Sequence, residues 1–169
     1  MSRWLCRGWA LLVLWGVWLG GAAADDPKEK PKVKLSADEQ KVLDLTNEQR
    51  KKENLPPLTA DPVLTKVARA HSANMARKKQ MNHVLDGKTP RDRMEAAGYK
   101  ASFGGENIGC GSPGWGPARM MKAWMESPRH RDNILSKNYK EIGIGIAKDD
   151  QGQVYYTQVF ASPKPESGK

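Results

Sequence analysis

Cysteine is scarce in this chain of 169 residues, which contains only Cys6 and Cys110. Cys6 lies in an N-terminal segment with the features of a cleaved signal, so Cys110 would be alone in the mature protein. A single cysteine excludes an internal disulfide, so the core and its hydrogen bonds must hold the fold. The sequence also has no HExxH motif and no cysteine pair, which excludes zinc sites recognisable from local spacing.

Long apolar runs are absent as well. The apolar run at residues 9–19 is shorter than the ~20 residues that a membrane-spanning helix needs. Arg3 and Arg7 precede this run and small residues follow it at 20–24, an order typical of a secretory signal peptide. We therefore predict a signal peptide over residues 1–24 and a secreted or cell-envelope protein, extracellular or periplasmic, with no transmembrane segment after cleavage. An uncleaved N-terminal anchor is the alternative.

Acidic residues are outnumbered, 19 against 28 Lys and Arg. Cleavage of the predicted signal would remove Arg3 and Arg7 and no acid, which lowers the net charge from +9 to +7. Such a surplus suits an anionic partner, a lipid headgroup or an anionic cell-wall polymer, although a solvated basic surface explains it equally well. No nucleic-acid-binding motif is present and aromatic and basic residues do not interleave, so no nucleic acid partner is expected.

The remaining chain is long enough for one domain. Residues 25–34 are charged and contain two prolines, which predicts a flexible arm. We place the domain at 35–162 and a loose polar tail at 163–169.

Capping signals predict several helices. Ser36 and Glu39 form a capping box at the start of a helix that runs to about residue 53. A proline in the first turn marks the other expected starts: Asp61-Pro62, Thr89-Pro90, Pro117 and Ser127-Pro128, the last opening a further turn.

Strand patterns dominate the end of the chain. Isoleucines alternate with small residues at 142–146, and β-branched and aromatic residues fill 154–160, which predicts a hairpin across the turn at 149–152. The glycine-rich stretch at 104–112 predicts a short strand. Helices followed by strands indicate an α+β fold, with helices covering a small, mostly antiparallel sheet.

Three histidines and one acid are candidates for metal binding, hydrogen bonding or acid–base catalysis. They are His71, His83, His130 and Glu106, of which Glu106 belongs to the glycine-rich stretch. Imidazole and carboxylate groups serve as zinc ligands, as buried hydrogen-bonding groups and as general acids or bases, and the spacing leaves these uses open. His71 falls on the apolar face of the second predicted helix, which favours a hydrogen-bonded core histidine.

Other side chains are interpreted as structural. Cys110 follows Glu106 closely, yet a lone thiol among glycines is more often a small packed side chain than a nucleophile. Arg93 and Arg131 are expected to anchor turns through charge-assisted hydrogen bonds to carbonyls or carboxylates. The apolar residues of the fourth predicted helix are expected in the core: Met120, Met121, Trp124 and Met125.

Four blocks of sequence occur in order: residues 82–99 with His83 near their start, GENI at 105–108, WMESPRHRDNIL at 124–135 and YYTQVF at 155–160. Together they resemble bacterial members of the CAP superfamily, which includes cysteine-rich secretory proteins, insect venom antigen 5 and plant pathogenesis-related proteins, with their SCP-type domain. The resemblance runs from about residue 42 to 161, nearly the whole predicted domain.

This resemblance implies a three-layer α-β-α sandwich whose central cleft is lined by histidines and glutamates. In animal and plant members the cleft holds two histidines and two acids and can take a divalent metal, often zinc. His83 matches the first histidine and Glu106 the first acid, whereas Ser127 and Tyr155 stand where the second acid and the closing histidine would be. His130 matches a histidine of the bacterial block and would fill the vacant place.

The candidate metal ligands are thus His83 and His130, with Glu106 as the neighbouring acid, and zinc or another divalent cation as the implied cofactor. The same three residues are the candidate catalytic groups. Residues expected to line or support the cleft are Asn107, Ser127, Tyr155 and Arg131.

Three hypotheses for function follow. The protein is a ligand-binding module whose cleft holds a lipid or a cell-wall fragment, with or without a divalent cation. Alternatively, it hydrolyses cell-wall peptidoglycan with water activated by a metal or by Glu106 and a histidine. In the third hypothesis it is a protein-interaction module without cleft chemistry. Because the sequence shows no clear nucleophile, we favour ligand binding over catalysis.

Overall fold

The computed structural model describes residues 32–165. The predicted signal peptide, most of the predicted arm and the end of the predicted tail lie outside the described residues. In chain order the elements are α1 (Ala37–Lys52), β1 (Thr59–Ala60), α2 (Pro62–Lys78), α3 (Pro90–Ala96), β2 (Ala101–Gly111), α4 (Pro117–Glu126), α5 (Pro128–Ile134), β3 (Glu141–Lys148) and β4 (Val154–Pro163). No helix within residues 32–165 has the length and apolarity required to cross a membrane.

The four strands form one sheet in the order β1-β3-β4-β2. β4 lies antiparallel to both β3 and β2, and only the two-residue β1 pairs in parallel, with β3. The predicted mostly antiparallel sheet is therefore confirmed. The sequence pattern does not predict β1 because two residues show no periodicity, and β2 begins at Ala101, three residues before the predicted strand. As an edge strand, β2 leaves one side of its backbone free for other elements.

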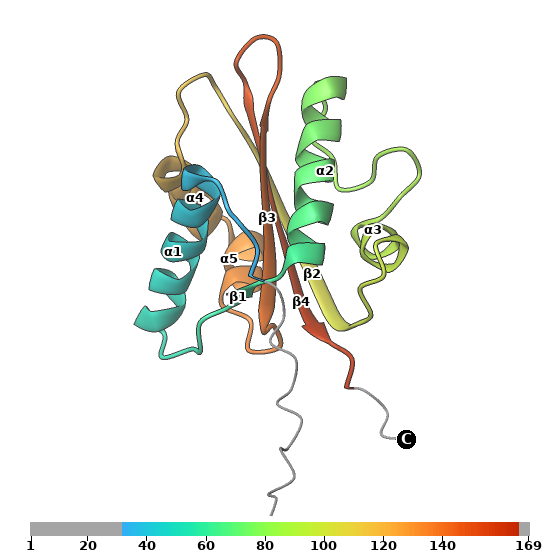
Figure 1. Cartoon of the computed structure of the whole chain (residues 1–169). Helices are drawn as coiled ribbons and strands as arrows, with labels where there is room; N and C mark the ends of the chain where they lie inside the picture. Colours follow the sequence, from blue (N-terminus) through green and yellow to red (C-terminus); the bar gives the residue numbers. More distant parts are fainter. Residues whose placement is uncertain (1–31, 166–169) are drawn as a thin grey trace, which may run out of the picture. The chain divides into compact units, whose positions relative to one another are not determined.

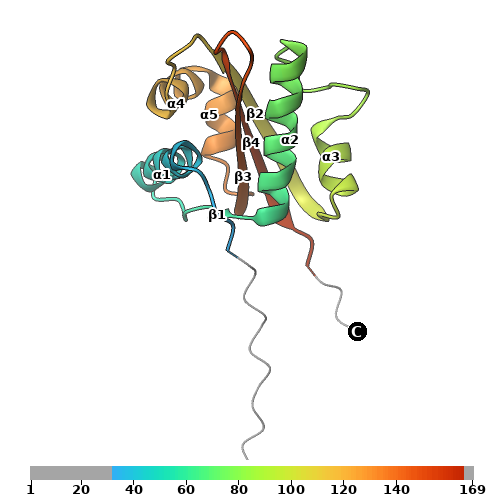
Figure 2. The ribbon, with the colours of Figure 1, turned by 45° about the horizontal axis from the view of Figure 1, so that its top comes forward.

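Helices cover both faces of the sheet, as Figures 1 and 2 show, with α1, α4 and α5 on one face and α2 and α3 on the other. The first face buries a core that includes Trp124, Met120 and Phe160. On the second face two smaller clusters form around Leu64 and Met75 of α2. The three-layer α-β-α sandwich that the resemblance implied is thus confirmed, and so is the core position of the methionine-rich α4.

The capping residues explain where the helices begin. Ser36 and Glu39 form the predicted capping box of α1, and Asp61 accepts hydrogen bonds from two backbone N–H groups of α2. Thr89 caps α3 and forms a second capping box with Asp92. The expectation for Ser127 was wrong, because its side chain makes no capping bond and the proline after it begins a helix, α5, rather than a single turn.

Two glycines of β3 bring α2 very close to the sheet. A Cβ added at Gly143 would lie 2.0 Å from the backbone of Leu64, and one at Gly145 would lie 2.2 Å from that of Ala68. Ser72 of α2 uses this proximity, since its hydroxyl donates to the Gly145 carbonyl at 2.9 Å. The close packing carries the C-terminal half of α2 over the sheet and towards β2.

Candidate functional site

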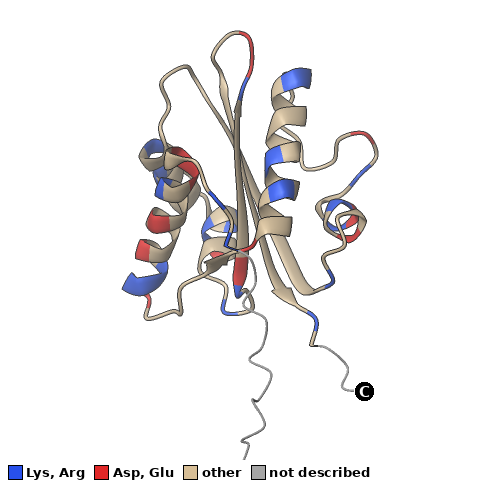
Figure 3. Cartoon of the chain, viewed as in Figure 1, with Lys and Arg blue, Asp and Glu red and all other residues tan. Residues whose placement is uncertain are grey.

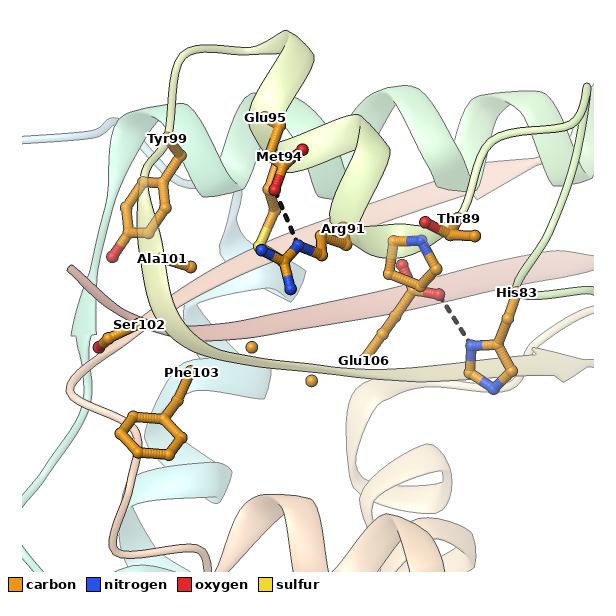
Figure 4. A pocket seen from close by; sticks show the side chains of 13 residues that line it. His83, Thr89, Arg91, Met94, Glu95, Tyr99, Ala101, Ser102, Phe103 and Glu106 are labelled. Carbon is orange, nitrogen blue, oxygen red and sulfur yellow. Dashed lines mark hydrogen bonds and ion pairs between the residues drawn. The ribbon is translucent and has the colours of Figure 1, made fainter. Parts of the chain in front are cut away.

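A buried carboxylate, Glu106 of β2, lies at the centre of the site. Its side chain is 1% exposed, and its Oε1 is 2.8 Å from Nδ1 of His83, the bond drawn in Figure 4. Its Oε2 accepts a hydrogen bond of 2.6 Å from Nη2 of Arg93. Two charge-assisted partners compensate the cost of burying this carboxylate. The structure thus brings together two of the predicted site residues, His83 and Glu106.

Arg93 holds the loop that carries His83 against α3. Its Nη1 donates to the backbone carbonyls of His83 and Lys88, both at 2.9 Å, while its Nη2 reaches Glu106. The expected role of Arg93 as the anchor of a turn is confirmed. The ion pair with Glu106 gives the same guanidinium a place in the site.

His71 of α2 is the third group beside this carboxylate. Its side chain is fully buried, and its Nε2 lies 3.8 Å from Oε1 of Glu106, beyond hydrogen-bonding distance. Burial lowers the pKa of His71; the charge of Glu106 and the nearby Asn82 backbone act in the opposite direction, while Arg93 and His83 lower it further. The predicted core position is correct, and the ring interacts with the Asn82 backbone and faces the Glu106 carboxylate.

His130 approaches from the other layer of the sandwich. Asn107 projects from β2 to the face opposite Glu106, where its Nδ2 donates to the His130 carbonyl at 3.0 Å. Nδ2 of Asn133 in turn donates to Oδ1 of Asn107 at 2.9 Å, which fastens α5 to the strand. Burial lowers the pKa of His130, and the charge of His83 lowers it further. The His130 carbonyl is therefore bonded to β2 through Asn107, and the His130 ring senses the charge of His83.

The remaining predicted residues lie at the margins of this group. Tyr155 is buried on β4 opposite Cys110 in the strand register, four residues along β2 from Glu106, and its hydroxyl interacts with Cys110 and Asp149. Burial raises the pKa of the Cys110 thiol, which disfavours a thiolate nucleophile.

Ser127 and Arg131 contribute through the backbone of α5. The Arg131 N–H donates to the Ser127 carbonyl at 2.9 Å, and the Arg131 carbonyl accepts from Leu135. The structure thus shows the backbone of Arg131 in the hydrogen bonds of α5, and the side-chain role of Arg131 stays a prediction.

A groove of about 320 Å³ opens between α3 and β2, beside His83. Figure 4 shows Phe103 and Tyr99 towards one end and His83 at the other, with Glu106 near His83. We call it the α3–β2 groove; its lining residues are His83, Thr89, Pro90, Arg91, Met94, Glu95, Tyr99, Ala101, Ser102, Phe103, Gly104, Gly105 and Glu106. Phe103 leaves 53% of its surface exposed, which is unusual for so large an apolar side chain.

The donor set does not fit a zinc ion. Zinc in proteins takes three or four His, Cys or carboxylate ligands at about 2.0–2.3 Å, and among residues 32–165 no three such residues are arranged to hold a metal. The guanidinium of Arg93 sits 2.6 Å from one carboxylate oxygen of Glu106, where its positive charge opposes a second cation. We therefore assign no metal-dependent reaction to this site.

Sequence reasoning missed two features of this site. His71 was placed in the core correctly, but no pattern along the chain indicated that α2 would bring it beside Glu106. The contribution of α3 to the groove, through Arg91 and Met94, was also not predicted. The only available signal was the glycine spacing at 143 and 145, which marks a close helix–strand approach without saying which helix approaches.

The chain resembles known proteins over most of the described domain. The family model described as CAP, the cysteine-rich secretory protein family, matches residues 43–160. The uncharacterized protein YkwD of Bacillus subtilis (strain 168) is 40% identical over 127 residues, which are 75% of this chain and 48% of YkwD. This chain therefore spans about half the length of that relative.

Solved structures share the fold. An outer surface protein from Borrelia burgdorferi superposes with a TM-score of 0.71 at 24% identity, over 80% of this chain and all of that chain. An extracellular protein containing a SCP domain from Bacillus anthracis str. Ames gives a TM-score of 0.66 at 29% identity, over 73% of this chain and 40% of that chain.

A structure of NaASP2 with Zn2+ has the same fold, with a TM-score of 0.54 at 15% identity, over 78% of this chain and 83% of that chain. At this identity the likeness concerns the fold alone. Since the family model covers more than half of the residues and the architecture agrees, this chain belongs to the CAP family, the cysteine-rich secretory protein family.

Proposed function

We propose that this chain is a secreted or cell-surface CAP module that binds a fragment of cell-wall polymer in the α3–β2 groove. The observation that carries the proposal is the mixed lining of the groove, in which Phe103, 53% exposed, lies towards one end and the Glu106–His83 pair towards the other (Figure 4). The descriptions of two structural relatives as an outer surface protein and an extracellular protein support the location. The basic surplus of the chain supports an anionic polymer.

The composition of the groove favours a sugar–peptide fragment over an acyl chain. Thr89, Arg91 and Ser102 hydrogen-bond to Asp92, Glu95 and the Ser162 carbonyl, and a long acyl chain would remove water from their remaining polar atoms without replacing it, at a cost in free energy. A sugar–peptide fragment offers hydroxyl and amide partners to these groups and an apolar ring face to Phe103. Its size also matches, since pockets of about 300 Å³ and more hold small ligands.

Binding of purified muropeptides, measured by isothermal titration calorimetry, tests this proposal. We expect Phe103→Ser to weaken the affinity about tenfold, because the ring would be the main apolar contact. Val84→Ser is the matched control: Val84 is 45% exposed and follows His83, but it is not among the residues that line the groove. Unchanged affinity of Phe103→Ser would exclude this groove.

Phospholipid vesicles serve as a second probe in the same experiment. If vesicles bind and muropeptides do not, and if Phe103→Ser weakens the binding of vesicles, the ligand of the groove is a lipid and not a wall fragment. Failure of both probes would exclude ligand binding in this groove and favour the protein-interaction hypothesis over it.

A second function, hydrolysis of peptidoglycan, is favoured by one specific observation. A carboxylate oxygen only accepts hydrogen bonds, so Nδ1 of His83 carries a proton, and Nε2 is the nitrogen that can accept one. Nε2 lies on the side of the ring away from Glu106, as Figure 4 shows, and the side chain is 47% exposed. This arrangement suits a general base that takes a proton from water.

Release of soluble fragments from purified cell wall tests the second function. We expect His83→Gln to abolish release, because glutamine accepts a hydrogen bond but does not take up a proton. The control, Gln80→Ala, alters an exposed side chain in the same loop. Equal release by His83→Gln and the parent chain would refute this mechanism.

A further inference from the structure

A second cavity, of about 620 Å³, lies between α2 and α3. It shares no lining residue with the α3–β2 groove, because α3 presents different side chains to each: Arg91, Met94 and Glu95 to the groove, and Arg93, Ala96 and Ala97 to the cavity. We call it the α2–α3 cavity. The Arg93–Glu106 ion pair separates the two spaces, since Glu106 lines the groove and Arg93 the cavity.

The charges around the α2–α3 cavity are mostly positive. Its basic lining residues are Lys66, Arg77, Lys88 and Arg93, of which Arg93 is already paired with Glu106 at 2.6 Å. Its one acidic lining residue, Asp86, is already engaged by Lys78 at 2.6 Å and by the Asn74 amide at 2.8 Å. Figure 3 shows basic residues along α2 and on the segment that leads into α3. The surroundings therefore favour an anion.

One buried polar group of the lining lacks a partner. Nε of Arg93 is buried and makes no hydrogen bond within the described residues. A buried donor without an acceptor carries an uncompensated desolvation cost, which a bound ligand can remove. The Arg93 Nε–H is a donor for an anionic oxygen.

The rest of the lining is small and apolar. It consists of Val67, Ala70, Ala73, Leu85, Ala96 and Ala97. A bare inorganic ion would leave these side chains in contact with water, whereas a ligand with a short apolar part would cover them. The volume lies within the range of small-molecule sites.

We propose that the α2–α3 cavity binds an amphiphilic organic anion, with a carboxylate or phosphate group facing Nε of Arg93 and the lysines of the lining, and an apolar portion against the alanines that line the cavity. This site is distinct from the α3–β2 groove and does not depend on the function proposed for it. A carboxylate and a phosphate ester both present anionic oxygens to the cavity. The experiment below distinguishes between these two head groups.

Amide chemical-shift changes in the 15N-labelled chain locate the binding site of each probe. Octanoate and octyl phosphate are the anionic probes, and octyl glucoside and octylammonium are the neutral and cationic controls. We expect either anion to shift the amides of Ala70, Ala73 and Ala97 while those of Ser102 and Phe103 stay unchanged, and the tighter-binding anion identifies the head group. Shifts confined to the groove residues, or equal binding of the neutral control, would overturn the proposal.

Charge removal provides the quantitative test. The double variant Lys66→Gln with Lys88→Gln should weaken binding of the anionic probe about tenfold, as expected for losing two charges near the ligand in water. The matched control removes two exposed lysines, Lys41 on α1 and Lys137 after α5, and should leave the affinity unchanged. An equal loss in both double variants would show a nonspecific charge effect and refute the site.

Discussion

Replacing Glu106 by glutamine tests the central contact of the site. The chain offers a matched comparison in two of its Arg–Glu ion pairs, one buried and one exposed. In the Arg93–Glu106 pair the side chains are 12% and 1% exposed at a distance of 2.6 Å. In the Arg91–Glu95 pair they are 80% and 57% exposed at 2.8 Å. Glu106→Gln and Glu95→Gln therefore make the same chemical change in two environments.

The expected magnitudes differ several-fold. Removing one partner of a buried ion pair costs about 3–5 kcal/mol, because the other charge is left buried without compensation. Glutamine retains one oxygen that accepts from Arg93 or His83, so we take about 3 kcal/mol for Glu106→Gln. For a chain of this size that loss lowers Tm by roughly 10 °C. The exposed pair contributes about 0.3–0.5 kcal/mol, so Glu95→Gln should change Tm by about 1–2 °C.

Urea and thermal unfolding followed by circular dichroism measure both variants. Adding Arg93→Gln to Glu106→Gln gives a double-mutant cycle, in which the second change should cost much less than it does in the parent chain. If Glu106→Gln is no more destabilising than Glu95→Gln, the carboxylate is not held as a buried ion pair. The chemistry proposed for the site would then lose its basis.

Three further predictions address pH, packing and metal. Burial lowers the pKa of His71, so below about pH 6.5 the unfolded state binds more protons than the folded state. The free energy of unfolding, measured by urea titration, should therefore fall as the pH drops below about 6.5. The fall should be smaller in His71→Gln. Gly145→Ala should destabilise the chain by about 3 kcal/mol through its clash with α2, whereas Gly116→Ala, with nothing within 4 Å, should be nearly neutral in thermal unfolding. Zinc should leave Tm unchanged because Arg93 neutralises Glu106, and a zinc-dependent rise in Tm would contradict this.

Local signals predict the structure correctly wherever the responsible contacts are themselves local. The caps at Ser36, Asp61 and Thr89 involve groups two or three residues away, so their residue types alone indicate the helix starts. Ser127 has a capping residue type and a proline after it, yet its side chain caps nothing. Whether the Ser127 hydroxyl caps α5 depends on how α5 packs against the rest of the domain. A short segment of sequence does not reveal that packing.

By itself, the sequence determined the order of the longer helices and strands, the family and the two candidate site residues that its motifs mark, His83 and Glu106. These depend on periodicity, capping and short motifs, which act over a few residues. Only the tertiary structure decided that Arg93 and His71 would surround Glu106 and that His130 would approach from the other layer. Such contacts depend on how closely helices and strands pack, here through Gly143 and Gly145, and packing distances arise only when distant segments meet.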